Sequence, residues 1–201
     1  LGLTGRRINR AEAYRLGLVT HCIAPERYAS ITAALENAEP VDPVLDGLHE
    51  DPDHAEDDLL ARADALDDCF ARPTIAEIID ALKSRAAGDG EGANWCRGVV
   101  DDLAARCPLS LLVTLRHLYE SRNGDLRETL IRDYRLAVRF LAGPDFAEGV
   151  RAVLIDKDNR PAWQHANIAD VPQSAVDAMF ESLGSDELDL KTRDEMQAMR
   201  I

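Results

Sequence analysis

The stretch from Asp133 to Trp163 constrains the fold more than any other part of this 201-residue chain. It reads DYRLAVRFLAGPDFAEGVRAVLIDKDNRPAW, two amphipathic helical patterns interrupted at Gly143-Pro144. The period of the apolar residues is that of a helix with one buried face. The first stripe comprises Leu126, Leu130, Tyr134, Ala137, Val138 and Leu141, and the second comprises Phe146, Val150, Val153 and Leu154. We therefore expect two consecutive helices whose stripes are packed in a core.

Capping signals predict helices along the rest of the chain. Asn9 with Glu12, and Thr74 with Glu77, have the spacing of a capping box, and Asp125 is a good N-cap. The expected helices cover residues 9–17, 26–37, 54–70, 75–88, 93–106, 108–122, 125–142, 144–155 and 172–183, with a short one around 44–49. One strand is expected at Leu18–Ile23, which alternates weakly and is rich in β-branched residues. The predicted fold class is mainly α.

The net charge of −14 comes almost entirely from one segment. Residues 36–68 hold 13 acidic residues against a single basic one, Arg62. A chain of this charge repels nucleic acid and anionic membranes, so we expect neither as a partner. No stretch approaches the roughly 20 apolar residues of a membrane span. The four cysteines, Cys22, Cys69, Cys96 and Cys107, have no metal-ligand spacing and are expected to be reduced thiols of a cytoplasmic protein.

Two groups of polar residues have compositions that suit a site, but their spacing does not. The cluster His49, Glu50, Asp51, Asp53 and His54 lies in a proline-rich connection without calcium-loop spacing, so we expect an acidic surface and no metal. Ser110, His117 and Asp125 could be read as a nucleophile triad. Ser110 and His117 are two helical turns apart, about 10 Å along the axis, which is too far for a hydrogen bond. We expect no catalytic residue in either group.

Two further patterns leave alternatives open. Asp145 and Glu148 are one turn apart, as in an acid–base pair, but they also suit the start of a helix at Pro144. Six cations, Arg132, Arg135, Arg139, Arg151, Lys157 and Arg160, fall within about 30 residues. They can be surface ion pairs, with Glu128 four residues before Arg132, or at least one of them can contact a phosphate.

Two segments together resemble the crotonase (enoyl-CoA hydratase/isomerase) superfamily. The first is Leu3-Thr4-Gly5-Arg6-Arg7-Ile8 followed by Ala11-Glu12-Ala13 and Gly17-Leu18-Val19, and the second is Asp145–Ala152 continuing to Lys157 and Pro161-Ala162-Trp163. The form of the second segment, and the acidic stretch with Cys69-Phe70, Thr74 and Glu77-Ile78, are similar to the 3-hydroxyisobutyryl-CoA hydrolase branch. The resemblance covers about residues 1–183.

The resemblance implies a fold and a division of the chain. The chain would be the C-terminal helical part of a crotonase-type α/β fold, with at most one or two short strands. Residues 1–37 would end the core, 38–183 would form a C-terminal helical lobe, and 184–201 a polar tail. The chain opens with LGLTGRRI and no Met, so it is expected to be part of a longer protein.

The resemblance also implies an activity, hydrolysis of a branched acyl-CoA thioester in valine breakdown. The superfamily's oxyanion-hole and carboxylate segments precede the first matching segment, so this chain alone is expected to be inactive. The alternatives are an enoyl-CoA hydratase/isomerase of the same superfamily and a non-catalytic helical assembly lobe, which exposed apolar residues on the first helices would favour.

The resemblance suggests where a ligand would touch this chain. In the superfamily a lysine of the second segment can approach the CoA phosphates, and the resemblance implies that the matching residue is Lys157, with Arg160 as a weaker candidate. The spacing from Ala152 to this lysine is one residue longer than usual, and Val153 replaces the usual aromatic. Acyl-CoA is the expected partner, homo-oligomers are possible, and no cofactor is expected because coenzyme A belongs to the substrate.

Overall fold

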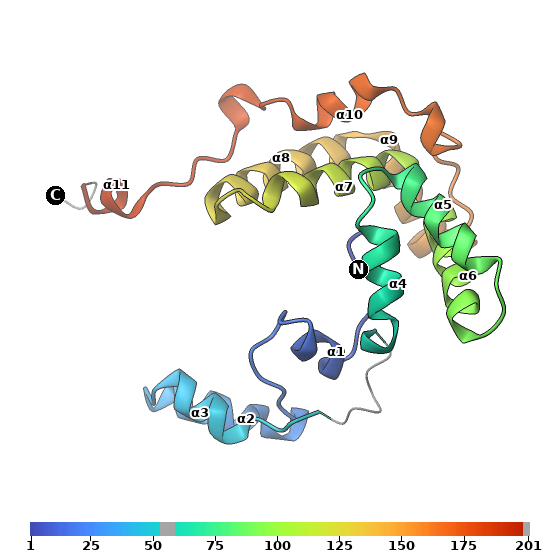
Figure 1. The fold of residues 1–201 in the computed structure, drawn as a ribbon. Coiled ribbons are helices and arrows are strands. Elements are labelled where there is room, and N and C mark those ends of the chain that lie inside the picture. Colours follow the sequence, from blue (N-terminus) through green and yellow to red (C-terminus); the bar gives the residue numbers. More distant parts are fainter. Residues whose placement is uncertain (53–58, 199–201) are drawn as a thin grey trace. The chain divides into compact units, whose positions relative to one another are not determined.

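The computed structural model describes residues 1–52 and 59–198, and every regular element in these ranges is a helix (Figure 1). The chain forms two compact units. One comprises residue 1 and residues 5–71, and the other comprises residues 2–4 and the chain from Arg72 onward. The domain borders expected at residues 37 and 183 were placed from the family resemblance. The division into two compact units does not test these borders, so they stay predictions.

The first unit is built from short helices. They are α1 (Arg10–Arg15), the 3₁₀ turn η1 (Pro25–Arg27), α2 (Tyr28–Glu36), α3 (Val41–Leu48), the 3₁₀ turn η3 (Leu60–Arg62) and α4 (Ala63–Phe70). The capping box of α1 is confirmed, because the Glu12 N–H donates to Asn9 Oδ1 at 2.8 Å and the Asn9 N–H donates to Glu12 Oε2 at 2.9 Å. Gly17 ends this helical region with φ +68°, a conformation that favours glycine.

One expectation for the first unit is wrong, and another is confirmed only in part. Leu18–Ile23 is not a strand, and its Cys22 instead exchanges single hydrogen bonds with the next segment: Cys22 N–H with His49 Nδ1, and Glu50 N–H with the Cys22 carbonyl, each 2.9 Å. A β-rich composition needs a partner strand, and the described residues offer none. The helix expected over 54–70 is a 3₁₀ turn and then α4 in its described part, while residues 53–58 lie outside the described ranges.

The second unit begins with a helical hairpin of α5 (Ile75–Ala86) and α6 (Glu91–Ala104). The Glu77 N–H donates to Thr74 Oγ1 at 3.2 Å, which is one half of the expected capping box. The facing sides of the hairpin carry buried residues, namely Ile75, Ile78 and Leu82 on α5 and Trp95, Cys96, Val99 and Leu103 on α6. These side chains form an apolar core between the two helices.

The second core lies among α7 (Pro108–Ser121), α8 (Leu126–Ala142) and α10 (Gln173–Phe180), which run close together in Figure 1. Its buried members are Val113, Leu136, Val171, Val176, Met179 and Phe180. Between α8 and α10 the chain forms α9 (Pro144–Val150), a π-helical turn η4 (Arg151–Ile155) and a 3₁₀ turn η5 (Ile168–Asp170). The 3₁₀ turn η6 (Gly184–Asp186) and α11 (Arg193–Ala198) follow.

The expectation that both apolar stripes are packed in a core is wrong. Leu126 on α8 is 75% exposed and Leu141 is 62% exposed, whereas Leu136, outside the predicted stripe, is the buried residue of α8. Val153 and Leu154 are also exposed. The helical period was read correctly, but a period shows only that a helix has an apolar face and not which element covers it. No helix in the described residues has the length and apolar content to cross a bilayer.

Candidate functional site

The candidate site is the loop of residues 156–164, which follows the π-helical turn η4. Two carboxylates of α9 fasten this loop through its backbone. Asp145 Oδ1 accepts from the Gln164 N–H at 2.7 Å, and Glu148 Oε1 accepts from the Ala162 N–H at 2.7 Å. Asp145 is only 7% exposed, and its other oxygen accepts from the Cys107 thiol at 3.2 Å. Both carboxylates therefore have structural partners, and this geometry does not favour the acid–base pair considered from the sequence.

One guanidinium holds three carboxylates around the same loop. Arg151 donates to both oxygens of Glu148, at 2.8 and 2.9 Å, to Asp158 at 2.8 Å, and to Asp156. It also donates to the main-chain carbonyl of Arg160 at 3.1 Å. Hydrogen bonds from Arg151 lower the pKa of Glu148 to about 2 and lower the pKa of Asp158. Hydrogen bonds to the carboxylates in turn raise the pKa of Arg151.

The loop has an unusual backbone where it carries the two predicted CoA-binding residues. Lys157 has φ +56° and Asn159 has φ +53°, which place two non-glycine residues in the left-handed region. Such residues cost about 1 kcal/mol each and persist when surrounding contacts fix them. The Asp156 N–H donates to the Arg151 carbonyl at 2.8 Å, and the Asn159 N–H donates to the Ala152 carbonyl at 3.0 Å. Both Lys157 and Arg160 are exposed.

An apolar groove of about 520 Å³ lies beside the loop, between α7, α8, α9 and Trp163. Its walls are formed by Cys107, Ser110, Phe140, Asp145, Phe146, Gly149, Val150, Val153, Leu154 and Trp163. The Trp163 ring packs so close to α9 that a Cβ on Gly149 would stand 3.3 Å from a ring carbon. Burial raises the pKa of the Cys107 thiol, so the groove presents a protonated thiol.

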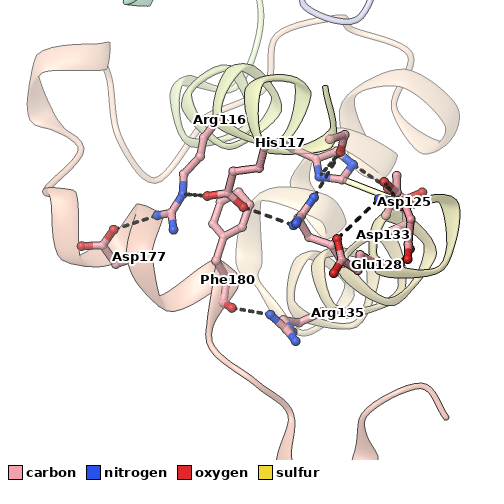
Figure 2. Close-up of polar contacts among 12 residues, drawn as sticks. Arg116, His117, Asp125, Glu128, Asp133, Arg135, Asp177 and Phe180 are labelled. Carbon is pink, nitrogen blue, oxygen red and sulfur yellow. Dashed lines mark hydrogen bonds and ion pairs between the residues drawn. The ribbon is translucent and has the colours of Figure 1, made fainter. Parts of the chain in front are cut away.

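The arginines of α8 contact other segments of the second unit, as Figure 2 shows in part. Arg135 donates to both oxygens of Glu187, at 2.9 and 3.1 Å, and to the Phe180 carbonyl at 2.6 Å. Arg139 donates to the carbonyl of Glu181 at 2.8 Å. Both residues thus fasten the segment after α10 to α8, and the hydrogen bonds from Arg135 lower the pKa of Glu187 to about 2.

The expected pairing of Glu128 with Arg132 is not formed. Glu128 completes the capping box of α8 with Asp125, while Arg132 reaches Glu120 of α7 at 3.2 Å and Ser121 Oγ at 3.2 Å. Glu128 therefore caps the start of α8, while Arg132 connects α8 to α7. Arg132 and Arg135 form ion pairs with partners distant in sequence, which i,i+4 spacing does not reveal, whereas Arg139 donates to main-chain carbonyls.

The structure separates the three members of the possible triad. Ser110 lines the groove, Asp125 caps α8 by accepting from the Glu128 N–H at 2.7 Å, and His117 Nε2 lies 2.7 Å from Asp133 Oδ1. Figure 2 shows His117 turned toward Asp133. The hydroxyl that does approach His117 is that of Ser121, 3.5 Å from Nδ1, which was missed although it is four residues away on the same helix.

The acidic cluster of the first unit forms no metal site in its described part. His49 Nδ1 accepts the Cys22 N–H, its Nε2 lies 3.4 Å from Asp51 Oδ1, and its ring contacts that of Tyr14 at 4.9 Å between centroids. Asp53 and His54 lie outside the described ranges. Within residues 1–52 and 59–198, no group of three histidine, cysteine or acidic side chains has a geometry that could hold a metal ion.

Comparisons with known proteins extend over nearly the whole chain. The family model described as enoyl-CoA hydratase/isomerase matches residues 1–180. The "3-hydroxyisobutyryl-CoA hydrolase 1" of Arabidopsis thaliana is 34% identical over 100% of this chain and 55% of its own length. The mitochondrial 3-hydroxyisobutyryl-CoA hydrolase of Mus musculus is 34% identical over 94% of this chain and 49% of its own length.

Solved structures agree with this comparison. A "Carnitinyl-CoA dehydratase" from Mycobacterium thermoresistibile has a TM-score of 0.78 and 30% identity, covering 93% of this chain and 51% of that one. An enoyl-CoA hydratase from Rhodobacter sphaeroides has a TM-score of 0.76 and 32% identity, covering 94% and 52%. The chain therefore spans about half the length of the proteins it matches.

Proposed function

The chain belongs to the enoyl-CoA hydratase/isomerase family, and from this premise we propose that it is the C-terminal portion of an acyl-CoA thioester hydrolase. Its substrate would be 3-hydroxyisobutyryl-CoA, an intermediate of valine breakdown. The observation that carries the proposal is the similarity of the whole chain to curated relatives named for that hydrolase. The catalytic carboxylates would lie in the half of the relatives that this chain does not cover.

The geometry of the described residues supports this division of labour. Asp145, which lines the groove, accepts from a backbone N–H group, and Glu148 accepts from a backbone N–H group and from Arg151. Lys157 and Arg160 are exposed cations, and no side-chain ion pair is formed by either within residues 1–52 and 59–198, so they suit contact with the CoA phosphates. Coenzyme A enters as part of the substrate, and we propose no separate cofactor.

The test is an assay on the protein expressed from its natural reading frame. It should release free CoA from 3-hydroxyisobutyryl-CoA, measured with a thiol reagent, and should not hydrate crotonyl-CoA, measured as loss of enoyl-thioester absorbance. The isolated 201-residue chain should release none. Hydration without hydrolysis would instead support the hydratase/isomerase alternative, and one of the two similar structures is named an enoyl-CoA hydratase.

One observation favours the assembly alternative as a second candidate. The first unit exposes the large apolar side chains Leu16, Leu18, Val19, Tyr28, Leu35 and Val41. Apolar side chains that remain exposed on several neighbouring helices can be covered by a partner in an assembly. An assembly lobe would form a stable complex of defined stoichiometry, including possible homo-oligomers, and sedimentation of the natural protein with and without acyl-CoA would detect it.

A cytoplasmic location is part of the same proposal. The four cysteines are buried and free, which suits a reducing compartment. The relatives from Mus musculus and Homo sapiens are named as mitochondrial proteins, so the alternative location is the mitochondrion. Fractionation of cells that carry the native protein distinguishes the two.

A further inference from the structure

The first five residues of the loop, 156–160, include two acidic and two basic side chains, and the structure gives the two kinds different surroundings. The acidic members Asp156 and Asp158 turn to Arg151. The cationic members Lys157 and Arg160 are exposed, and the described residues provide no side-chain ion pair for either of them. In a chain of net charge −14, two carboxylates beside Lys157 would otherwise be its nearest partners. Arg151 therefore keeps the lysine ammonium available by occupying those carboxylates itself.

The same guanidinium also fixes the backbone that directs Lys157. Arg151 binds α9 through Glu148, the start of the loop through Asp156, and the end of the loop through the Arg160 carbonyl. The left-handed residues Lys157 and Asn159 lie between these anchor points. Without the anchors, both would relax toward ordinary negative φ, and a change of φ at Lys157 rotates its side chain to another direction.

We propose that Arg151 is a positioning residue for phosphate recognition, which holds Lys157 where it can contact the phosphates of coenzyme A. This inference rests on the proposed acyl-CoA function. It assigns to Arg151 a role that its own contacts do not allow it to fill directly, because four acceptors in the chain already engage its guanidinium. Lysine cannot replace it, because an ammonium lacks the planar fork that reaches several carboxylates at once.

The test compares CoA with pantetheine, which has no phosphate, by calorimetry on the protein from its natural reading frame. Lys157→Ala should weaken CoA binding about 10-fold, the effect of losing one charged hydrogen bond, and should leave pantetheine binding unchanged. Arg151→Lys should reproduce this result. The double variant should be no worse than Lys157→Ala alone, because both changes remove the same contact. A merely structural defect would weaken both ligands.

The control is Arg135→Lys, which alters a comparable network on α8 and should leave the affinity for both ligands unchanged. If Arg151→Lys unfolds the protein, Asp158→Asn removes one anchor while Arg151 keeps Glu148, and it should give a partial loss for CoA only. Normal CoA affinity in Lys157→Ala would overturn the phosphate contact itself. The positioning role alone would be overturned by a different result: Lys157→Ala loses CoA affinity 10-fold, but Arg151→Lys binds CoA normally or its loss adds independently to that of Lys157→Ala in the double variant.

Discussion

The same side-chain truncation at Leu82 and at Leu126 should have very different effects on stability. Leu82 is 0% exposed between α5 and α6, whereas Leu126 at the start of α8 is 75% exposed. Leu→Ala removes three carbons, worth about 2.4 kcal/mol at roughly 0.8 kcal/mol each when buried. A cavity adds to this at Leu82, where measured losses of about 2.7–5 kcal/mol are typical, so we expect about 3 kcal/mol. Only a quarter of Leu126 is buried, which gives roughly 0.6 kcal/mol, partly offset by the better helix propensity of alanine.

Urea denaturation measures both changes in the free energy of unfolding. Circular dichroism follows all helices, and the fluorescence of Trp95 on α6 reports on the hairpin that contains Leu82. A loss above about 2 kcal/mol in Leu126→Ala would mean that another surface covers this face of α8 in solution. That result would refute the assignment of the stripe as exposed, and a loss below about 1 kcal/mol in Leu82→Ala would refute the packing of the hairpin.

Two further perturbations follow from single contacts. Arg135 lowers the pKa of Glu187 from 4.5 to about 2, so this pair stabilises the fold above pH 4.5 and its contribution is lost as the pH falls from about 4.5 to about 2. Melting temperatures of the wild type and of Glu187→Gln should therefore differ at pH 7 and converge toward pH 2, and a constant difference would contradict the pairing. Gly149→Ala places a Cβ 3.3 Å from Trp163 and should shift the tryptophan emission. The control Gly47→Ala in α3 meets nothing within 4 Å, so it should stabilise the fold by about 0.5–1 kcal/mol without a spectral change. Unchanged emission in Gly149→Ala would show that the Trp163 ring does not pack against α9.

Local chemistry allowed much of the fold to be predicted. The capping box at Asn9 and the N-cap at Asp125 form as expected, because donor and acceptor lie within one turn of the chain, while only one half of the box expected at Thr74 is formed. The break at Gly143-Pro144 separates α8 from α9 as expected, because proline cannot continue the hydrogen bonding of the preceding helix. Family membership was also correct, since it rests on motifs that span most of the sequence.

The failures share a physical cause, which is dependence on partners distant in the chain. The segment Leu18–Ile23 has the composition of a strand but no ladder partner among the described residues. Arg132 selects Glu120 of the preceding helix because Glu128 is engaged in its own cap. At the candidate site, the family resemblance pointed to Lys157 and Arg160 as residues that contact CoA, and this stays a prediction. The sequence did not reveal the cluster around Arg151, because its carboxylates come both from α9 and from the loop after the π-helical turn.

The π-helical turn of η4 bears on how this part of the protein can change its length. A π turn closes its hydrogen bonds over five residues where an α-helix uses four, as the bond from the Asp156 N–H to the Arg151 carbonyl illustrates. It therefore stores one extra residue within the helix while the chain on both sides keeps its place. An insertion or deletion of one residue can therefore be absorbed at this turn without displacing the helix before it or the loop after it.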